Sequence, residues 1–319
     1  MIETRLTRAF DLRHPIVSAP MARAAGGKLA AAVTRAGALG MIGGGYCDAE
    51  WIETEFAQAG NAHVGCGLIT WRLAQDPGVL DHVLSHQPRA LFLSFDDPKP
   101  FAPAIHAAGV PLICQVQTLA GAHQALEAGA AVIVAQGGEA GGHGGTRGTL
   151  AFVPEVADLL AAQSPETLLL AAGGISDGRG LAAALMLGAD GVLMGTRFWA
   201  SAEALVHRNQ IAAALAATGD ATIKTKTVDI ARGFEWPEDT DLRVLRNDFT
   251  DRWQTDLTGL RAAGEAEAAR WVDAWVNGDV GTGNAIAGEA VGLIRSAPSA
   301  DQIITATVKQ AKTLLDKGW

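Results

Sequence analysis

The feature that most constrains this chain is a unit that repeats through its first two thirds: a short apolar run, a break of Gly, Pro or polar residues, and an Ala-rich segment. The apolar runs predict buried strands and the Ala-rich segments predict helices, so each repeat indicates a parallel βα unit. The strand-like runs cover residues 16–19, 39–42, 64–68, 90–94, 112–116, 131–135, 168–171 and 191–194. Eight such units are the number that closes a (β/α)8 TIM barrel.

The runs alone do not separate a closed barrel from an open doubly wound sheet, because both bury their parallel strands. Helices are expected between the runs, for example over residues 28–36, 119–128 and 181–187, which are rich in Ala and Leu. An open dinucleotide-binding sheet would place G-x-G-x-x-G after its first strand, whereas this chain has Ala19-Pro20-Met21 there. The strand count and this missing motif favour the barrel.

The chain of 319 residues exceeds the roughly 250 that one barrel needs. After Trp199 the repeat stops, and we expect one long helix over 202–218, a helical region over 242–278 and a closing helix over 300–315. Three tryptophans in the second of these are expected to form a core: Trp253, Trp271 and Trp275. We therefore predict a barrel made of residues 1–210 and 285–319, with a small, mostly helical cap, the substrate domain, over 211–284.

Composition and charge exclude several classes of protein. The net charge of −9 and the lack of Lys/Arg-rich runs disfavour nucleic acid as a partner. The first 14 residues have no apolar core typical of an export signal, and no run approaches 18 apolar residues, so a cytoplasmic protein without a membrane span is expected. The cysteines, Cys47, Cys66 and Cys114, are too widely spaced to indicate disulfides or a metal site.

Two glycine turns follow the last two predicted strands, where barrel enzymes often bind a phosphate. Gly173-Gly174 follows the seventh strand, and Gly195-Thr196 follows the eighth. Glycines let backbone N–H groups approach an anion closely, and a helix beginning after Gly195 would add a favourable dipole. Either glycine pair alone is equally compatible with a tight βα turn; together, at these two strands, they predict a phosphate site.

The segment 135–145, after the sixth strand, is the most distinctive: six of its eleven residues are glycine, and it contains His143. A glycine-rich loop leaves backbone amides free to face a flat polar ligand. His143 is the one side chain there that titrates near neutral pH, so it could remove a proton from carbon or hold an anionic substrate. The alternative is a loop histidine that only contacts solvent. Its position between glycines at a barrel mouth favours the functional interpretation.

Taken together and in order, these motifs resemble those of the nitronate monooxygenase (2-nitropropane dioxygenase) family. The resemblance rests on Ala19-Pro20-Met21, Gly43-Gly44-Gly45, the 136–143 segment, Ala172-Gly173-Gly174-Ile175, Met194-Gly195-Thr196-Arg197-Phe198, Gly278-Asp279 and Ala287-Gly288. It implies an FMN-containing barrel with a helical cap that oxidises alkyl nitronates (nitroalkanes) with dioxygen to a carbonyl compound and nitrite. His143 matches the catalytic histidine of the family. The residues implied to bind FMN are Ala19, Pro20, Met21, Gly43, Gln115, Gln136, Gly141, Gly142, Gly173, Gly174, Gly195 and Thr196.

Two positions depart from some members of that family. Where those relatives have Asn at the end of the third strand and Lys after the fifth, this chain has Gly67 and Gln115. Loss of the Lys would remove a positive charge near the flavin and alter its potential or its preferred oxidant. Alternatively, Gln115 hydrogen-bonds the flavin and the change is only subfamily variation.

Other functions fit the same motifs. They also resemble FMN-dependent enoyl-acyl-carrier-protein reductases and NAD(P)H:quinone reductases, whose electron donor is a nicotinamide. A phosphate-binding barrel lyase or isomerase would use the same turns, and a flavin-binding protein without catalysis would not need His143. Trp71, Trp199 and Trp236 are candidate walls of the substrate pocket. The physiological substrate, the electron donor and the oligomeric state are left open, although barrel enzymes of this size often form homodimers.

Overall fold

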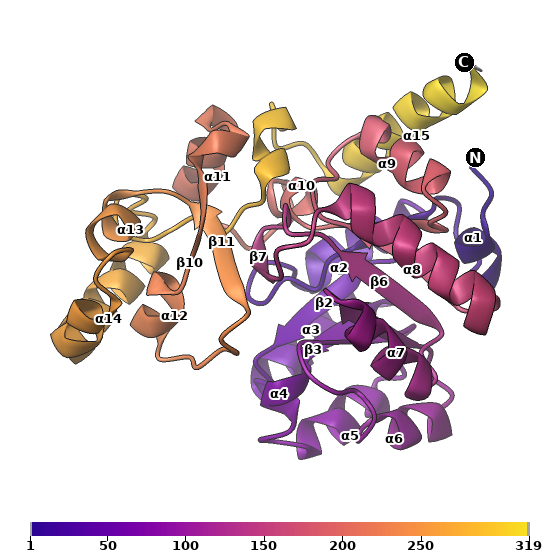
Figure 1. The fold of residues 1–319 in the computed structure, drawn as a ribbon, viewed down its shortest axis with the longest axis horizontal. Coiled ribbons are helices and arrows are strands. Elements are labelled where there is room, and N and C mark those ends of the chain that lie inside the picture. The colour runs from indigo at the N-terminus through magenta and orange to yellow at the C-terminus, as the bar shows by residue number, and fades with distance from the viewer. Residues whose placement is uncertain (1, 318–319) are drawn as a thin grey trace.

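The computed structural model describes residues 2–317, and its centre is a sheet of eight parallel strands (Figure 1). In spatial order they run β1-β9-β8-β6-β5-β4-β3-β2. The strands are β1 (Ile16–Ser18), β2 (Met41–Gly45), β3 (Gly65–Ile69), β4 (Leu91–Ser94), β5 (Leu112–Val116), β6 (Val132–Gln136), β8 (Leu168–Ala172) and β9 (Gly191–Met194). The sheet closes where Val17 bridges Leu39 in parallel, so the prediction of a (β/α)8 barrel is confirmed and the open sheet is excluded.

Helices surround the strands, because each buries an apolar stripe against the outside of the barrel. They are α2 (Gly27–Arg35), α3 (Ala49–Ala59), α5 (Gly78–Ser85), α6 (Ala102–Ala107), α7 (Leu119–Glu127), α8 (Thr149–Gln163), α9 (Gly178–Met186) and α15 (Ala300–Asp316), with the short α4 (Thr70–Leu73) and α10 (Thr196–Trp199). The helices predicted over 28–36, 119–128, 181–187 and 300–315 are confirmed to within a few residues. The last helix, α15, packs against α9 and α2 and so completes the ring.

The amino-terminal end of the barrel is closed by α1 (Arg5–Ala9). Leu6 and Phe10 are buried in the same cluster as Val17, Phe92 and other inward-facing strand residues. The guanidinium of Arg5 fixes this plug, because it donates to both carboxylate oxygens of Asp190 at 2.8 and 2.7 Å. The opposite end, where the strands finish, is therefore the end available for a site.

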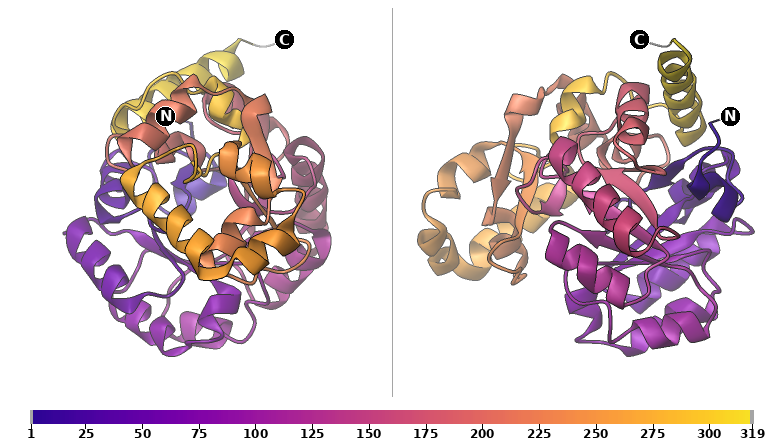
Figure 2. Two further views of the ribbon diagram at one scale, coloured as in Figure 1. Left: turned by 90° about the vertical axis from the view of Figure 1, so that its left-hand side faces the viewer. Right: turned by 45° about the vertical axis from the view of Figure 1, so that its right-hand side comes forward.

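A second group of elements follows β9 and covers that opposite end of the barrel (Figure 2). Its elements are α11 (Arg208–Ala216), η1 (Gly219–Ala221), β10 (Thr222–Thr225), α12 (Thr227–Arg232), β11 (Asp241–Leu245), α13 (Asp248–Trp253), α14 (Leu257–Asn277) and η2 (Glu289–Leu293). It has its own apolar cluster, in which Phe249, Trp253 and Trp271 are buried and Trp275 is partly buried. The predicted core role of these tryptophans is confirmed.

Two predictions for this region are wrong. Residues 202–218 do not form one helix: α11 starts only at Arg208, since His207 adopts an extended backbone and its Nδ1 caps the helix by accepting from the N–H of Asn209. Residues 242–245 belong to strand β11, not to a helix, because Leu242 and Val244 alternate with polar neighbours and are both buried. Within residues 2–317, no helix has the length and apolarity needed to cross a membrane.

Candidate functional site

A cavity of about 450 Å³ lies between the carboxyl ends of the barrel strands and the second group of elements. Most of the site residues predicted from sequence line it, although they come from six separate stretches of the chain. Those that line it are Ala19, Pro20, Met21, Gln115, Gln136, Gly141, Gly142, His143, Gly173, Gly174, Gly195 and Thr196. Of the three tryptophans expected as walls, Trp199 and Trp236 line the cavity.

Gly43 and Trp71 do not line the cavity, but each contacts a residue that does: Met21 and Trp236. The N–H of Gly43 donates to the carbonyl of Ala25 at 2.8 Å, and a Cβ at Gly43 would lie 2.2 Å from the carbonyl oxygen of Met21. Gly43 therefore lets β2 pack directly behind the Met21 turn, and its contact with the cofactor stays a prediction. The Trp71 ring packs edge-on against Trp236, with 5.4 Å between the ring centroids.

The two predicted glycine turns form a cradle at one end of the cavity. Gly173 and Gly174 have φ values of +98° and +71°, which residues with a Cβ rarely adopt. A Cβ at Gly195 would point toward Ala19 and Met21 and so would occupy the cavity floor. The hydroxyl of Thr196 accepts a hydrogen bond from the N–H of Gly288 at 2.9 Å, which joins this turn to the segment before η2. Glycine backbone of this kind could approach a phosphate closely.

Gly67 and Gln115, the two departures noted in the sequence, both line this cavity. A Cβ at Gly67 would be 2.4 Å from the Cβ of Pro20, so the missing side chain allows the Pro20 ring to pack against β3. Gln115, at the end of β5, is half-buried and lines the cavity. Its amide forms no hydrogen bond with residues 2–317, so it is available to a ligand.

His143 lies on a strand, whereas the sequence indicated a loop. Strand β7 (Gly142–Gly144) pairs antiparallel with β11, with His143 opposite Leu242, and β11 in turn pairs with β10. The segment is held further by Arg243, whose guanidinium donates to the carbonyl of Gly138 at 3.0 and 3.2 Å. This pairing fixes the position of the histidine against the second group of elements. It also uses backbone N–H and C=O groups of the segment that were expected to face a ligand.

Gln136 anchors the same segment from the barrel side. Its amide nitrogen donates to the carbonyl of His143 at 3.0 Å, and its amide oxygen accepts from the side chain of Gln117 at 2.8 Å. Both ends of this side-chain amide thus contribute to holding the backbone of His143. The predicted proximity of Gln136 to the cofactor is compatible with this role, since Gln136 also lines the cavity.

The imidazole of His143 pairs with a buried carboxylate that the sequence did not indicate. Its Nε2 lies 3.0 Å from both carboxylate oxygens of Asp229, on α12, and the two residues are 9% and 3% exposed. The indole of Trp236 stacks on the imidazole with 3.4 Å between centroids and 10° between planes. Because the carboxylate accepts from Nε2–H, the lone pair of the neutral ring is at Nδ1, for which residues 2–317 provide no hydrogen bond.

Burial lowers the pKa of His143 below its ordinary value, and it outweighs the hydrogen bond and the charge of Asp229, which raise it. Arg232 also lowers this pKa, and Asp241 raises it. A neutral imidazole held by a carboxylate at neutral pH is suited to accept a proton from carbon. The pair therefore has the orientation and charge that a general base would need.

Aromatic rings form the side of the cavity next to His143. The rings of Tyr46 and Phe234 are stacked with 4.1 Å between centroids, and the guanidinium of Arg232 lies 5.0 and 4.7 Å from them. Burial raises the pKa of Tyr46, so its phenol stays protonated. No motif indicated these residues, because they come from the turn after β2, the end of α12 and the segment that follows it. The wall is mainly aromatic, with the Arg232 guanidinium against it and Trp236 stacked on the imidazole of His143.

The fold and the cavity define a barrel enzyme whose site lies at the carboxyl ends of the strands. A family model described as nitronate monooxygenase matches residues 48–310. A nitronate monooxygenase of Neurospora crassa is 33% identical over 95% of this chain and 90% of its own length, and nitronate monooxygenase npaC of Metarhizium robertsii is 36% identical over 94% and 91%. The solved structure of FabK from Thermotoga maritima covers 99% of this chain and 98% of its own, with a TM-score of 0.88 and 30% identity.

The chain belongs to the nitronate monooxygenase family, and it is an oxidoreductase. The resemblance found in the sequence motifs is thereby confirmed. The range matched by the family model also includes the second group of elements, from Arg208 to Leu293.

Proposed function

We propose that this protein is an FMN-dependent enzyme that oxidises alkyl nitronates with dioxygen, giving a carbonyl compound and nitrite. The observation that carries the proposal is the buried His143–Asp229 pair in a cavity that also contains the Gly173-Gly174 and Gly195-Thr196 turns. A base and a phosphate cradle in one cavity match a site that handles both a carbon acid and a phosphorylated cofactor. The relatives named nitronate monooxygenase support the choice of substrate class.

The residues fit FMN in two respects. The positive φ values at Gly173 and Gly174 and the open space at Gly195 suit the phosphate. The apolar residues Ala19, Pro20 and Met21 suit the isoalloxazine, and the Gln115 amide lines the same cavity. When bound, FMN supplies the electron transfer between the nitronate and dioxygen.

The protein's own residues bind the substrate and control its proton. We assign His143 Nδ1 as the atom that accepts the α-proton of a neutral nitroalkane, and Asp229 as the positioning residue that fixes the ring through Nε2. With a preformed nitronate that proton is already absent, so the basicity of Nδ1 contributes nothing to that reaction. The rings of Trp236 and Phe95 restrict water on the side of the base, because both pack against the imidazole.

We further propose a division of the chain into a cofactor-binding barrel, residues 1–210 and 285–319, and a substrate-binding cap, residues 211–284. The separate apolar cluster around Trp253 and Trp271 supports the cap as a unit. The packing of α15 against α9 and α2 supports assigning the carboxyl-terminal helix to the barrel. Under this division, His143 on β7 belongs to the barrel, and the cap contributes Asp229 and Trp236, which contact its imidazole.

Aerobic turnover tests this function directly. The purified protein is expected to contain FMN and, with propyl-2-nitronate in air, to consume oxygen and form nitrite. Replacing His143 with Ala should reduce kcat/KM for neutral 2-nitropropane by about 10² to 10⁴-fold while FMN stays bound, because general-base catalysis contributes that much. Activity toward the preformed nitronate should fall much less. Equal losses for the two substrates would contradict the role of His143 as a base.

A second candidate is an FMN-dependent oxidoreductase that takes electrons from NADH or NADPH, of the enoyl reductase or quinone reductase type. The observation that favours it is the 30% identity and close structural match to FabK over almost the whole chain. The aromatic wall formed by Tyr46, Phe234 and Trp236 also offers flat surfaces for a nicotinamide or a quinone. Oxygen uptake that requires NAD(P)H and does not respond to nitronate would favour this candidate.

A further inference from the structure

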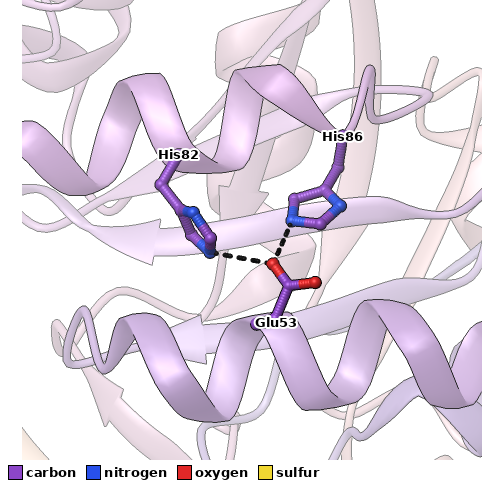
Figure 3. Close-up of side chains that lie close together, drawn as sticks. All are labelled: Glu53, His82 and His86. Carbon is purple, nitrogen blue, oxygen red and sulfur yellow. Dashed lines mark hydrogen bonds and ion pairs between the residues drawn. The ribbon is translucent and has the colours of Figure 1, made fainter.

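Two histidines and a glutamate meet on the outside of the barrel, between α3 and α5 (Figure 3). Glu53 projects from α3, and His82 and His86 come from α5 and its carboxyl-terminal cap. The two histidines are four positions apart, so they lie on the same face of the helix. None of the three lines the cavity described above.

The three side chains present one ligand atom each to a common point. The Nε2 atoms of His82 and His86 lie 3.5 and 3.0 Å from the same carboxylate oxygen of Glu53, and all three ligand atoms are within 4.8 Å of one another. A tetrahedral zinc ion with bonds of about 2.0–2.1 Å separates its ligand atoms by roughly 3.3 Å. The two measured separations lie on either side of that value, so binding an ion requires only small side-chain movements.

An ordinary hydrogen-bonded cluster explains only part of this arrangement. His86 forms a hydrogen bond with Glu53, and its ring is fixed by stacking on Phe56 with 4.3 Å between centroids. The Nε2 of His82 is buried from solvent and makes only a long 3.5 Å contact with the same oxygen (Figure 3), with no hydrogen bond to any of residues 2–317. A buried nitrogen without a partner is costly in free energy, and a metal ion would satisfy it.

We propose that Glu53, His82 and His86 bind a divalent transition-metal ion, with Zn²⁺ as the preferred ion. Two imidazoles and one carboxylate are typical zinc ligands, and a water molecule would complete the tetrahedron. Mg²⁺ and Ca²⁺ prefer oxygen ligands, so they are not expected to bind. Because the ligands come from two helices, the ion links α3 to α5 and stabilises this side of the barrel.

Calorimetric titration of the flavin-loaded, tag-free, chelator-treated protein with ZnCl₂ tests the proposal. We expect one equivalent of Zn²⁺ to bind to the wild-type protein, and MgCl₂ to give no binding heat. His82→Ala, His86→Ala and Glu53→Gln should each weaken binding by at least about tenfold, since even an outer-shell residue of a metal site is worth that much. His63→Ala, which removes a neighbouring exposed histidine outside the cluster, should bind as the wild type does.

Two results would overturn the proposal. One is the absence of stoichiometric Zn²⁺ binding to the wild-type protein. The other is unchanged affinity in the three cluster variants, which would locate any bound zinc elsewhere. Melting temperatures provide an independent measurement, because a ligand that binds only the folded state raises the melting temperature. Zn²⁺ should raise that of the wild type and of His63→Ala, but not that of His82→Ala; flavin content checks that each variant is folded.

Discussion

His143 and Asp229 are 86 positions apart in the chain, yet the imidazole Nε2 of one lies 3.0 Å from both carboxylate oxygens of the other. The contact depends on two non-local pairings: β7 with β11, which fixes the histidine, and the packing of α12 against α14, which fixes the carboxylate. The His143–Asp229 contact therefore joins β7 to α12 and relies on elements that follow the barrel strands in the chain.

Replacing Asp229 with Asn tests the positioning role of the carboxylate. Asp229 raises the pKa of His143 against the lowering effect of burial, so Asp229→Asn should move the acidic limb of kcat/KM for 2-nitropropane to lower pH. The rate at the plateau should fall by about 10² -fold or more, because the ring loses its orientation and basicity. Asp241→Asn, which removes a weaker charge effect on the same ring, should give a smaller shift in the same direction. A pH profile of Asp229→Asn that superimposes on the wild type would argue against the pair.

The buried histidine also predicts how stability depends on pH. Because the pKa of His143 is lower in the folded state than in the unfolded chain, the unfolded state binds the proton first as the pH falls below about 6.5. The free energy of unfolding therefore falls as the pH drops from about 6.5 to the folded-state pKa of His143, and this loss is absent above about pH 6.5. The decrease in melting temperature between pH 7.5 and pH 5 should be smaller for His143→Gln than for the wild type. Identical decreases would show that His143 does not titrate in this way.

The cradle predicts a specific loss of cofactor. In Gly195→Val, the added side chain would extend from a Cβ position 3.6 Å from Ala19 and 3.9 Å from Met21, into the space assigned to the flavin. We expect the variant to purify folded but with a small fraction of the wild-type FMN content, measured by absorbance after denaturation. Gly78→Ala is the matched control, since a Cβ there meets no atom closer than 3.9 Å. Full FMN content in Gly195→Val would remove this turn from the cofactor site.

Gln115 predicts the direction of a change in flavin potential. Gln115→Lys would add a positive charge at the cavity, where the amide of Gln115 has no hydrogen-bond partner among residues 2–317. A nearby cation stabilises the reduced, anionic flavin, so the midpoint potential should rise by roughly tens of millivolts. Gln115→Met, which removes the amide without adding charge, should change the potential much less. Spectroelectrochemical titration of the three proteins measures this, and an unchanged potential in Gln115→Lys would place the flavin away from Gln115.

The barrel could be predicted from sequence because each of its strands is a local apolar run, and the turns at Gly173 and Gly195 follow such runs directly. Strand β7 could not be predicted in the same way: Gly142, His143 and Gly144 have no strand propensity, and their partner strand lies about 100 positions later. Asp229 was missed because it lies in a polar segment with no motif. The alternation in β11 was a usable signal that the surrounding helical charge pattern concealed.

The electron donor is the most direct test of the proposed function. Under anaerobic conditions, the purified protein is mixed with propyl-2-nitronate and, separately, with NADH and with NADPH, while the flavin absorbance is followed in a stopped-flow instrument. The proposal predicts rapid loss of the oxidised flavin spectrum with the nitronate and no comparable change with either nicotinamide. Rapid loss with NADH or NADPH alone, and none with the nitronate, would contradict it.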